Sequence, residues 1–86
     1  MNRDKEISAL YKVLVLYECF LSDQSPINID SYLNYIDRLY VYWVGIGDEE
    51  ISTILKGLWR IGANAGHKRV KSLVFHMIDI INKKGG

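Results

Sequence analysis

The sequence predicts an all-α protein, a four-helix antiparallel bundle formed by a single domain over residues 1–86. Apolar residues recur at intervals of three and four along most of the chain, which is the spacing of a helix with one buried face. Turn-forming residues interrupt this pattern at only three places, and the connections between the segments are short. Short connections between amphipathic segments are typical of an up-and-down helical bundle.

The first helix is expected over about residues 4–22. Two apolar stripes lie along it, so that most of its surface is apolar, and it is expected to be the central helix. The stripes are Ile7, Leu10, Tyr11, Leu14, Tyr17 and Leu21, and then Val13, Leu16 and Phe20. Cys19 lies within this run and is the only cysteine. We expect it to be a buried small hydrophobe in a reducing compartment, and a disulfide within the chain is excluded.

The second helix is expected to begin at Pro26, after the turn at residues 22–25, and to reach about Val44. Pro26 suits the first helical position, and Ser25 before it can cap free backbone N–H groups. Residues 40–44 have β-prone composition, but no second strand pattern exists to pair with them, so a helix is predicted there too. Its core stripe is Ile29, Tyr32, Leu33, Ile36, Leu39, Tyr40 and Trp43.

The third helix is expected to follow the break at residues 45–47 and to extend to about Ile61. Asp48, Glu49 and Glu50 lie at its start, where negative charge interacts favourably with the helix dipole. This acidic triplet is therefore interpreted as a structural feature and not as a metal or catalytic cluster. The expected buried stripe is Ile51, Ile54, Leu55, Leu58 and Ile61.

The fourth helix is expected over about residues 67–83, after the joint at residues 62–66. Gly62 suits the C-terminal cap of the third helix, and Asn64 is a candidate cap for the fourth. Residues 83–86 are expected to fray. The core stripe is Val70, Leu73, Val74, Met77 and Ile81.

A homodimer is predicted from the amount of apolar surface. A chain of 86 residues is near the lower limit for a self-sufficient hydrophobic core. Tyr35 and Tyr42 lie beside the main stripe of the second helix, and Phe75 and Ile78 lie beside that of the fourth. Together with the first helix, this is more apolar surface than a monomer of this length is expected to cover.

The charge distribution is uneven. Residues 1–50 hold nine acidic and four basic side chains, for a net charge of −5, whereas residues 51–86 hold seven basic side chains and one acidic one, for +6. His67, Lys68, Arg69 and Lys71 are at the start of the fourth helix, where cations oppose the helix dipole. Three interpretations remain open: contact with the acidic half of the fold or of a dimer mate, an external acidic protein, or nucleic acid.

Nucleic-acid binding by a helix-turn-helix is the alternative function. Residues 54–78 resemble that motif in outline, with a glycine in the joint and a basic helix after it. The register fits poorly, because placing Gly62 at the turn glycine puts Leu58 where a small residue belongs. It also puts Lys68 and Lys71 where the recognition helix buries apolar groups.

Several classes of function are not supported by any motif. His67 and His76 are nine residues apart and do not share a helix face as metal ligands do. Nucleophile elbows, Gly-rich phosphate loops and cofactor motifs are missing, so neither an enzyme, a cofactor nor a small-molecule substrate is expected. The longest uncharged runs, residues 13–17 and 39–47, are far shorter than the ~20 residues that cross a bilayer. Without a signal-peptide pattern, a cytoplasmic location is expected.

The stretch Leu58-Trp59-Arg60-Ile61-Gly62-Ala63-Asn64-Ala65-Gly66 is similar to the helix-to-loop "IGxxAG" segment of pediocin-like bacteriocin immunity proteins. The Tyr-rich helix before it is also similar in character. The resemblance implies a small cytosolic four-helix bundle that protects the producing cell by a binding act. The chain departs from the family after Gly66, where a regular helix replaces the flexible tail expected to govern specificity.

These observations predict a non-catalytic protein-interaction module that acts by stoichiometric binding, of the inhibitor, immunity or adaptor type. Exposed Tyr35 and Tyr42 are the predicted anchors for a partner. A basic set is expected to guide an acidic partner electrostatically and consists of Lys56, Arg60, His67, Lys68, Arg69 and Lys71. A small DNA-binding regulator is the alternative.

Overall fold

The computed structural model describes residues 1–85 and contains four α-helices. They are α1 (Arg3–Ser22), α2 (Pro26–Gly45), α3 (Glu49–Ile61) and α4 (His67–Gly85), with a short 3-10 helix, η1 (Gly62–Ala65), between the last two. No strand is found in this part of the chain, and residues 40–44 are helical. The prediction of an all-α four-helix protein is confirmed, and the helix ends lie within about two residues of those expected.

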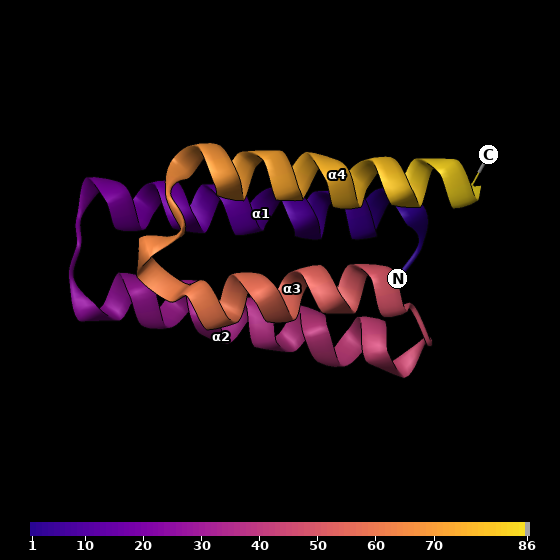
Figure 1. The fold of residues 1–86 in the computed structure, drawn as a ribbon, viewed down its shortest axis with the longest axis horizontal. Coiled ribbons are helices and arrows are strands. Elements are labelled where there is room, and N and C mark those ends of the chain that lie inside the picture. Colours follow the sequence, from indigo (N-terminus) through magenta and orange to yellow (C-terminus); the bar gives the residue numbers. More distant parts are fainter. Residues whose placement is uncertain (86) are drawn as a thin grey trace.

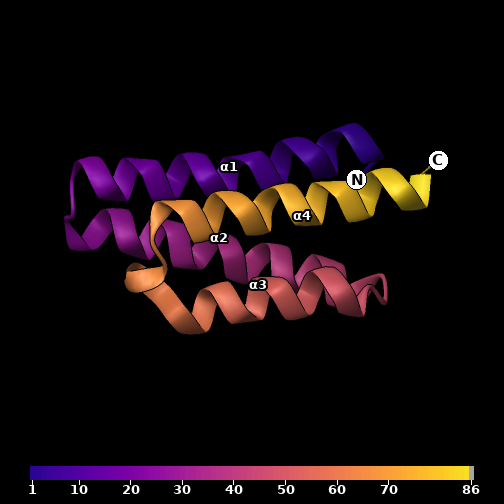
Figure 2. The same ribbon diagram turned by 45° about the horizontal axis from the view of Figure 1, so that its top comes forward.

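The helices run alternately up and down and form two layers (Figure 1). One layer contains α1 and α4, and the other contains α2 and α3, with both chain termini at the same end of the bundle (Figures 1 and 2). The molecule measures 38 × 21 × 19 Å, so its length is set by helices of about 20 residues at 1.5 Å per residue. The two layers enclose the core, and each layer has an outer face of two helices.

The core contains apolar residues from all four helices. Its largest fully buried side chains are Trp43, Tyr17 and Tyr32. The expectation that the first helix is central is wrong, because α1 packs closely only on α2 and α4 and forms one corner of the bundle. Its outer face therefore remains exposed, and Cys19, expected to be buried, lies on it as an exposed free thiol.

Two of the predicted caps differ from the structure. Pro26 is the first residue of α2 as expected, but the Ser25 hydroxyl makes no capping hydrogen bond. The turn is closed instead by the Asn28 side-chain amide, which donates to the Asp23 carbonyl oxygen at 2.7 Å. Asn64 lies inside η1, so Gly66 and not Asn64 directly precedes α4. Gly62 caps α3 as predicted, in a left-handed conformation at φ 67° that favours glycine.

Tyr17 holds the joint between α3 and α4 against α1. Its buried hydroxyl donates to the Ala63 carbonyl oxygen and accepts from the Gly66 N–H, both at 2.8 Å. One phenol thereby binds two backbone groups that lie 46 and 49 residues further along the chain. The position of the basic start of α4 relative to α1 depends on this contact.

The opposite end of the bundle is joined through Asp48. Its carboxylate caps α3 by accepting from the Ile51 N–H at 3.0 Å, and it also accepts from Lys84 Nζ at 2.8 Å. The predicted structural role of the acidic triplet is confirmed for this residue.

The last helix is longer than expected. The prediction that residues 83–86 fray is wrong for residues 83–85, because α4 continues to Gly85. Gly86 lies outside the described residues.

Candidate functional site

The start of α4 forms a basic hollow beside the joint. Lys68 and Arg69 line it together with Ser72 and Leu73 of the same helix and with Ala65 and Gly66 of the joint. Both cationic side chains are exposed. We call these six residues the joint hollow.

Internal charge compensation at this end is limited to one contact. His67 Nε2 lies 2.8 Å from Glu18 Oε2 on α1. Within residues 1–85, no ion pair includes Lys68, Arg69 or Lys71, and the only other ion pairs join Lys83 to Asp79 and Lys84 to Asp48. Apart from the contact between Glu18 and His67, the acidic first half of the chain therefore does not neutralise the basic start of α4 through ion pairs.

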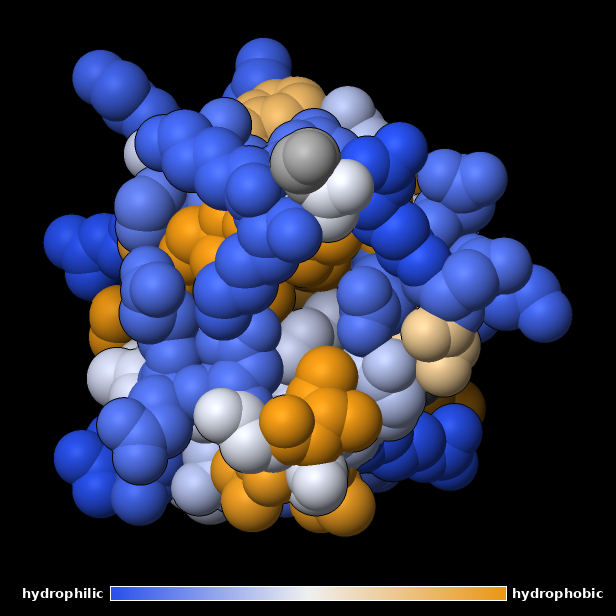
Figure 3. All heavy atoms as spheres, turned by 90° about the vertical axis from the view of Figure 1, so that its right-hand side faces the viewer, coloured by the Kyte–Doolittle hydropathy of each residue, from blue (hydrophilic) through white to orange (hydrophobic). Residues whose placement is uncertain are grey.

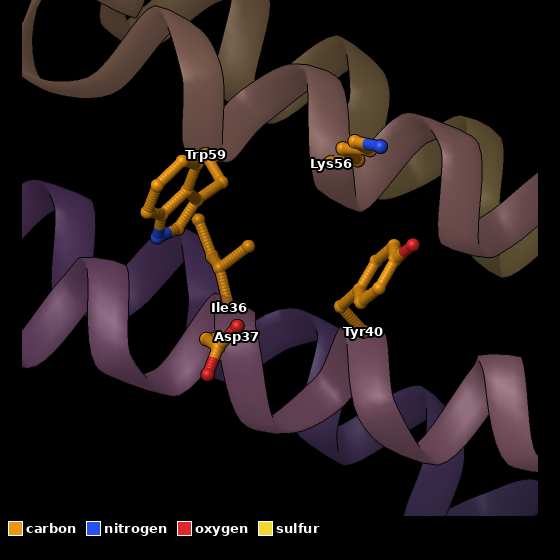
Figure 4. A pocket seen from close by; sticks show the side chains of 5 residues that line it. All are labelled: Ile36, Asp37, Tyr40, Lys56 and Trp59. Carbon is orange, nitrogen blue, oxygen red and sulfur yellow. The ribbon is translucent and has the colours of Figure 1, made fainter.

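The rest of the basic set lies elsewhere. Lys56 lines a groove of about 270 Å³ between α2 and α3, on the other layer of the bundle. Arg60 is exposed on α3. Lys56 thus lines a different pocket from Lys68 and Arg69, on a different layer of the bundle. The groove is lined by Ile36, Asp37, Tyr40, Lys56 and Trp59 (Figure 4).

Trp59 is the residue that the sequence analysis missed. Half of its surface (50%) is exposed, although tryptophan is among the largest apolar side chains. It extends from α3 toward the α2 side of the groove, where Ile36 also lies (Figure 4). A signal for it was present in the sequence, because Trp59 lies outside the predicted apolar stripe of its helix, between Lys56 and Arg60.

Val41 and Val44 follow Asp37 on α2 at spacings of four and seven, so they share its side of the helix. Val41 is 63% exposed and Val44 is 50% exposed. Figure 3 shows the end of the bundle where the termini lie, and apolar side chains appear there both on the lower side, where α2 and α3 run, and between the charged side chains above. We call Tyr40, Val41, Val44 and Trp59, with Asp37 and Lys56 beside them, the α2–α3 face.

Tyr35 and Tyr42 are not the exposed anchors that the sequence predicted. Both are half-buried, because they point toward α1. The Tyr35 hydroxyl donates to the Ala9 carbonyl oxygen at 2.9 Å, and the Tyr42 hydroxyl donates to Glu6 Oε2 at 2.7 Å. Burial raises the pKa of Tyr35, and the hydrogen bond to Glu6, together with burial and the carboxylate charge, raises the pKa of Tyr42. These tyrosines join two helices of the fold.

Within residues 1–85, no three His, Cys, Asp or Glu side chains lie close enough together to hold a metal ion. None of the helices in this range is both long enough and apolar enough to cross a membrane. No protein-family model matches the chain, and no curated protein or solved structure is significantly similar to it.

Proposed function

We propose that this chain is a non-catalytic protein-interaction module that binds an acidic protein surface stoichiometrically, as an inhibitor, immunity or adaptor factor. We also propose that it acts in the cytoplasm and as a homodimer. The joint hollow is the proposed contact site for the acidic partner.

The lack of an ion pair for Lys68 and Arg69 in the first turn of α4 is the observation that supports this proposal. Lys68 and Arg69 oppose the dipole of their own helix, and neither forms an ion pair within residues 1–85. Free backbone N–H groups at a helix start also attract anions. A carboxylate-rich partner surface would satisfy both features, while Leu73 supplies an apolar contact in the same hollow.

The direction of the helices favours a protein partner over DNA. A DNA-reading helix-turn-helix places its two helices at about 90–120° to each other. Here α3 and α4 run antiparallel within one bundle (Figures 1 and 2). With this geometry, α4 cannot enter a major groove in the usual way while α3 crosses the phosphate backbone.

The similarity to pediocin-like immunity proteins supports the immunity form of this proposal. The similar stretch, residues 58–66, includes the end of α3, all of η1 and Gly66. Residues 65 and 66 are among those that line the joint hollow. The resemblance therefore falls on the part of the chain that shapes the proposed contact site.

A charge-reversal experiment tests the proposal. Lys68→Glu/Arg69→Glu is compared with Lys5→Glu/Arg38→Glu, which changes the net charge equally but lies away from the hollow. We expect a lysate pull-down to recover a protein with the wild type and the control, with or without nuclease, and not with the hollow variant. Recovery that nuclease abolishes would favour the DNA-binding alternative. Equal recovery by all three proteins would exclude the joint hollow as the contact site.

A further inference from the structure

We propose that the α2–α3 face is the interface of a symmetric homodimer, in which Asp37 of each copy pairs with Lys56 of the other. The inference rests on the self-association part of the proposed function and gives it a location. It is separate from the joint hollow, which lies at the start of α4.

The apolar part of this face lacks a partner within the chain. Trp59, Val41 and Val44 are each at least half exposed, and Trp59 forms no aromatic pair within residues 1–85. The opposite layer differs, because its exposed rings Tyr11 and Phe75 already pack edge to face at 5.6 Å. Tryptophan is the residue most enriched where protein interfaces concentrate their binding energy.

The charges of this face are complementary to a second copy of itself. Asp37 and Lys56 line the same groove from opposite helices, one acidic and one basic. They form no ion pair with each other, and Figure 4 shows their side chains pointing in different directions. An isologous interface requires such a surface, in which each group finds its complement in the same patch of the other copy.

A two-fold axis along the groove, parallel to the helices, satisfies this requirement. Rotation about it lays α2 of one copy over α3 of the other and keeps each residue at its own level along the bundle. Figure 4 shows Asp37 at the level of Trp59 and Lys56 at the level of Tyr40. The rotation therefore brings Asp37 to the partner's α3 about one helical turn from Lys56 along the axis, twice per dimer. It also turns Trp59 toward the partner's α2.

A dimer of standard size would use a modest share of the surface of the chain. A standard interface buries about 800 Å² of each partner. The chain exposes 5268 Å² in total, so such an interface would use roughly one seventh of its surface. The outer face of the α2–α3 layer extends along a bundle 38 Å long.

A mixing experiment tests the pairing directly. In Asp37→Lys homodimers both charge pairs become Lys–Lys, and in Lys56→Glu homodimers both become Asp–Glu. An equimolar mixture, however, can form a heterodimer in which both pairs are again opposite in charge. By light scattering, we expect a dimeric wild type, each variant weakened about tenfold or more in self-association, and recovery of the dimer on mixing.

Val15→Ser is the matched control, because Val15 is 52% exposed on α1 in the opposite layer. It should leave the dimer intact, whereas Trp59→Ala should dissociate it. A monomeric wild type, a dimer insensitive to both charge variants, or no recovery on mixing would each overturn the proposal. Circular dichroism checks that every variant remains helical.

Tryptophan fluorescence of the unmodified protein gives an independent readout. Trp43 is 1% exposed and should not respond to dilution, so a red shift on dilution would report Trp59 becoming exposed as the dimer dissociates. An emission maximum independent of concentration across the light-scattering transition would contradict the assigned face. Partner capture in the pull-down reports on the joint hollow alone. If the pull-down recovers no partner while the dimer is intact, only the acidic-partner proposal is refuted.

Discussion

Tyr32 has a fully buried side chain whose hydroxyl has no hydrogen-bond partner among residues 1–85. Burial, with a smaller contribution from nearby Tyr17, raises the pKa of this phenol, so it stays neutral while its O–H group is desolvated. Because a buried unsatisfied polar group costs about 1–3 kcal/mol, we expect Tyr32→Phe to raise the free energy of unfolding by about 1 kcal/mol. Urea denaturation measures this change.

Tyr35→Phe is the control for that substitution. Its hydroxyl donates to the Ala9 carbonyl oxygen, so its removal should lower the free energy of unfolding by about 1 kcal/mol. If Tyr32→Phe destabilised the protein as much as Tyr35→Phe, the Tyr32 hydroxyl would have a partner in solution and the interpretation would be wrong.

At the scale of the helix, α3 contains a glycine at a position where the backbone conformation does not require one. Gly57 lies inside the helix, has no left-handed backbone conformation, and would place an added Cβ in open space. Glycine inside a helix costs about 0.5–1 kcal/mol relative to alanine. We therefore expect Gly57→Ala to raise the free energy of unfolding by about 0.5–1 kcal/mol, measured by urea denaturation.

Gly62→Ala is the matched substitution at the end of the same helix. At φ 67° an added side chain is strained although space is available, so this variant should be less stable than the wild type by about 1 kcal/mol or more. Two glycine-to-alanine changes five residues apart should thus have opposite signs. Equal signs would contradict the backbone conformations described for α3.

At the scale of the whole molecule, Asp48 joins the start of α3 to the end of α4 and makes the free energy of unfolding depend on pH. Burial raises the pKa of Asp48, but hydrogen bonds from Lys84 and the Ile51 N–H outweigh it, so the pKa lies below its ordinary value of 3.8. The folded state therefore binds this proton less readily than the unfolded state does. The resulting stabilisation is present above the ordinary pKa and is lost as the pH falls through the folded-state pKa.

Asp48→Asn tests this linkage. Asparagine can still cap α3 but cannot pair with Lys84, so at neutral pH we expect the substitution to lower the free energy of unfolding by about 0.5–1 kcal/mol. Below about pH 4 the difference from the wild type should shrink. Thermal denaturation as a function of pH measures both effects. Asp79→Asn is the control, because its exposed pair with Lys83 within α4 should contribute less than about 0.5 kcal/mol. A difference that stays constant with pH would contradict the role assigned to the Asp48 carboxylate.

The sequence by itself determined the helices and their ends, because these depend on local properties. Apolar spacing identified most of each buried stripe, although Tyr11, Leu21 and Ile61 of the predicted stripes are exposed. Pro26, Gly62 and the acidic residue at position 48 marked helix ends through their own backbone and charge preferences. It also located the basic start of α4, since that cluster is contiguous in sequence.

Only the tertiary structure decided which side of each helix meets a neighbour. The first helix is apolar nearly all round, so its sequence does not distinguish a central from a corner position, and Cys19 lies on the exposed side. Tyr35 and Tyr42 lie beside an apolar stripe, and whether they face water or α1 depends on where α1 packs. The exposure of Trp59 depends in the same way on how α3 lies against α2. Helical periodicity is a property of one segment, whereas burial is a property of two segments in contact, and their relative rotation is set by the packing of the whole core.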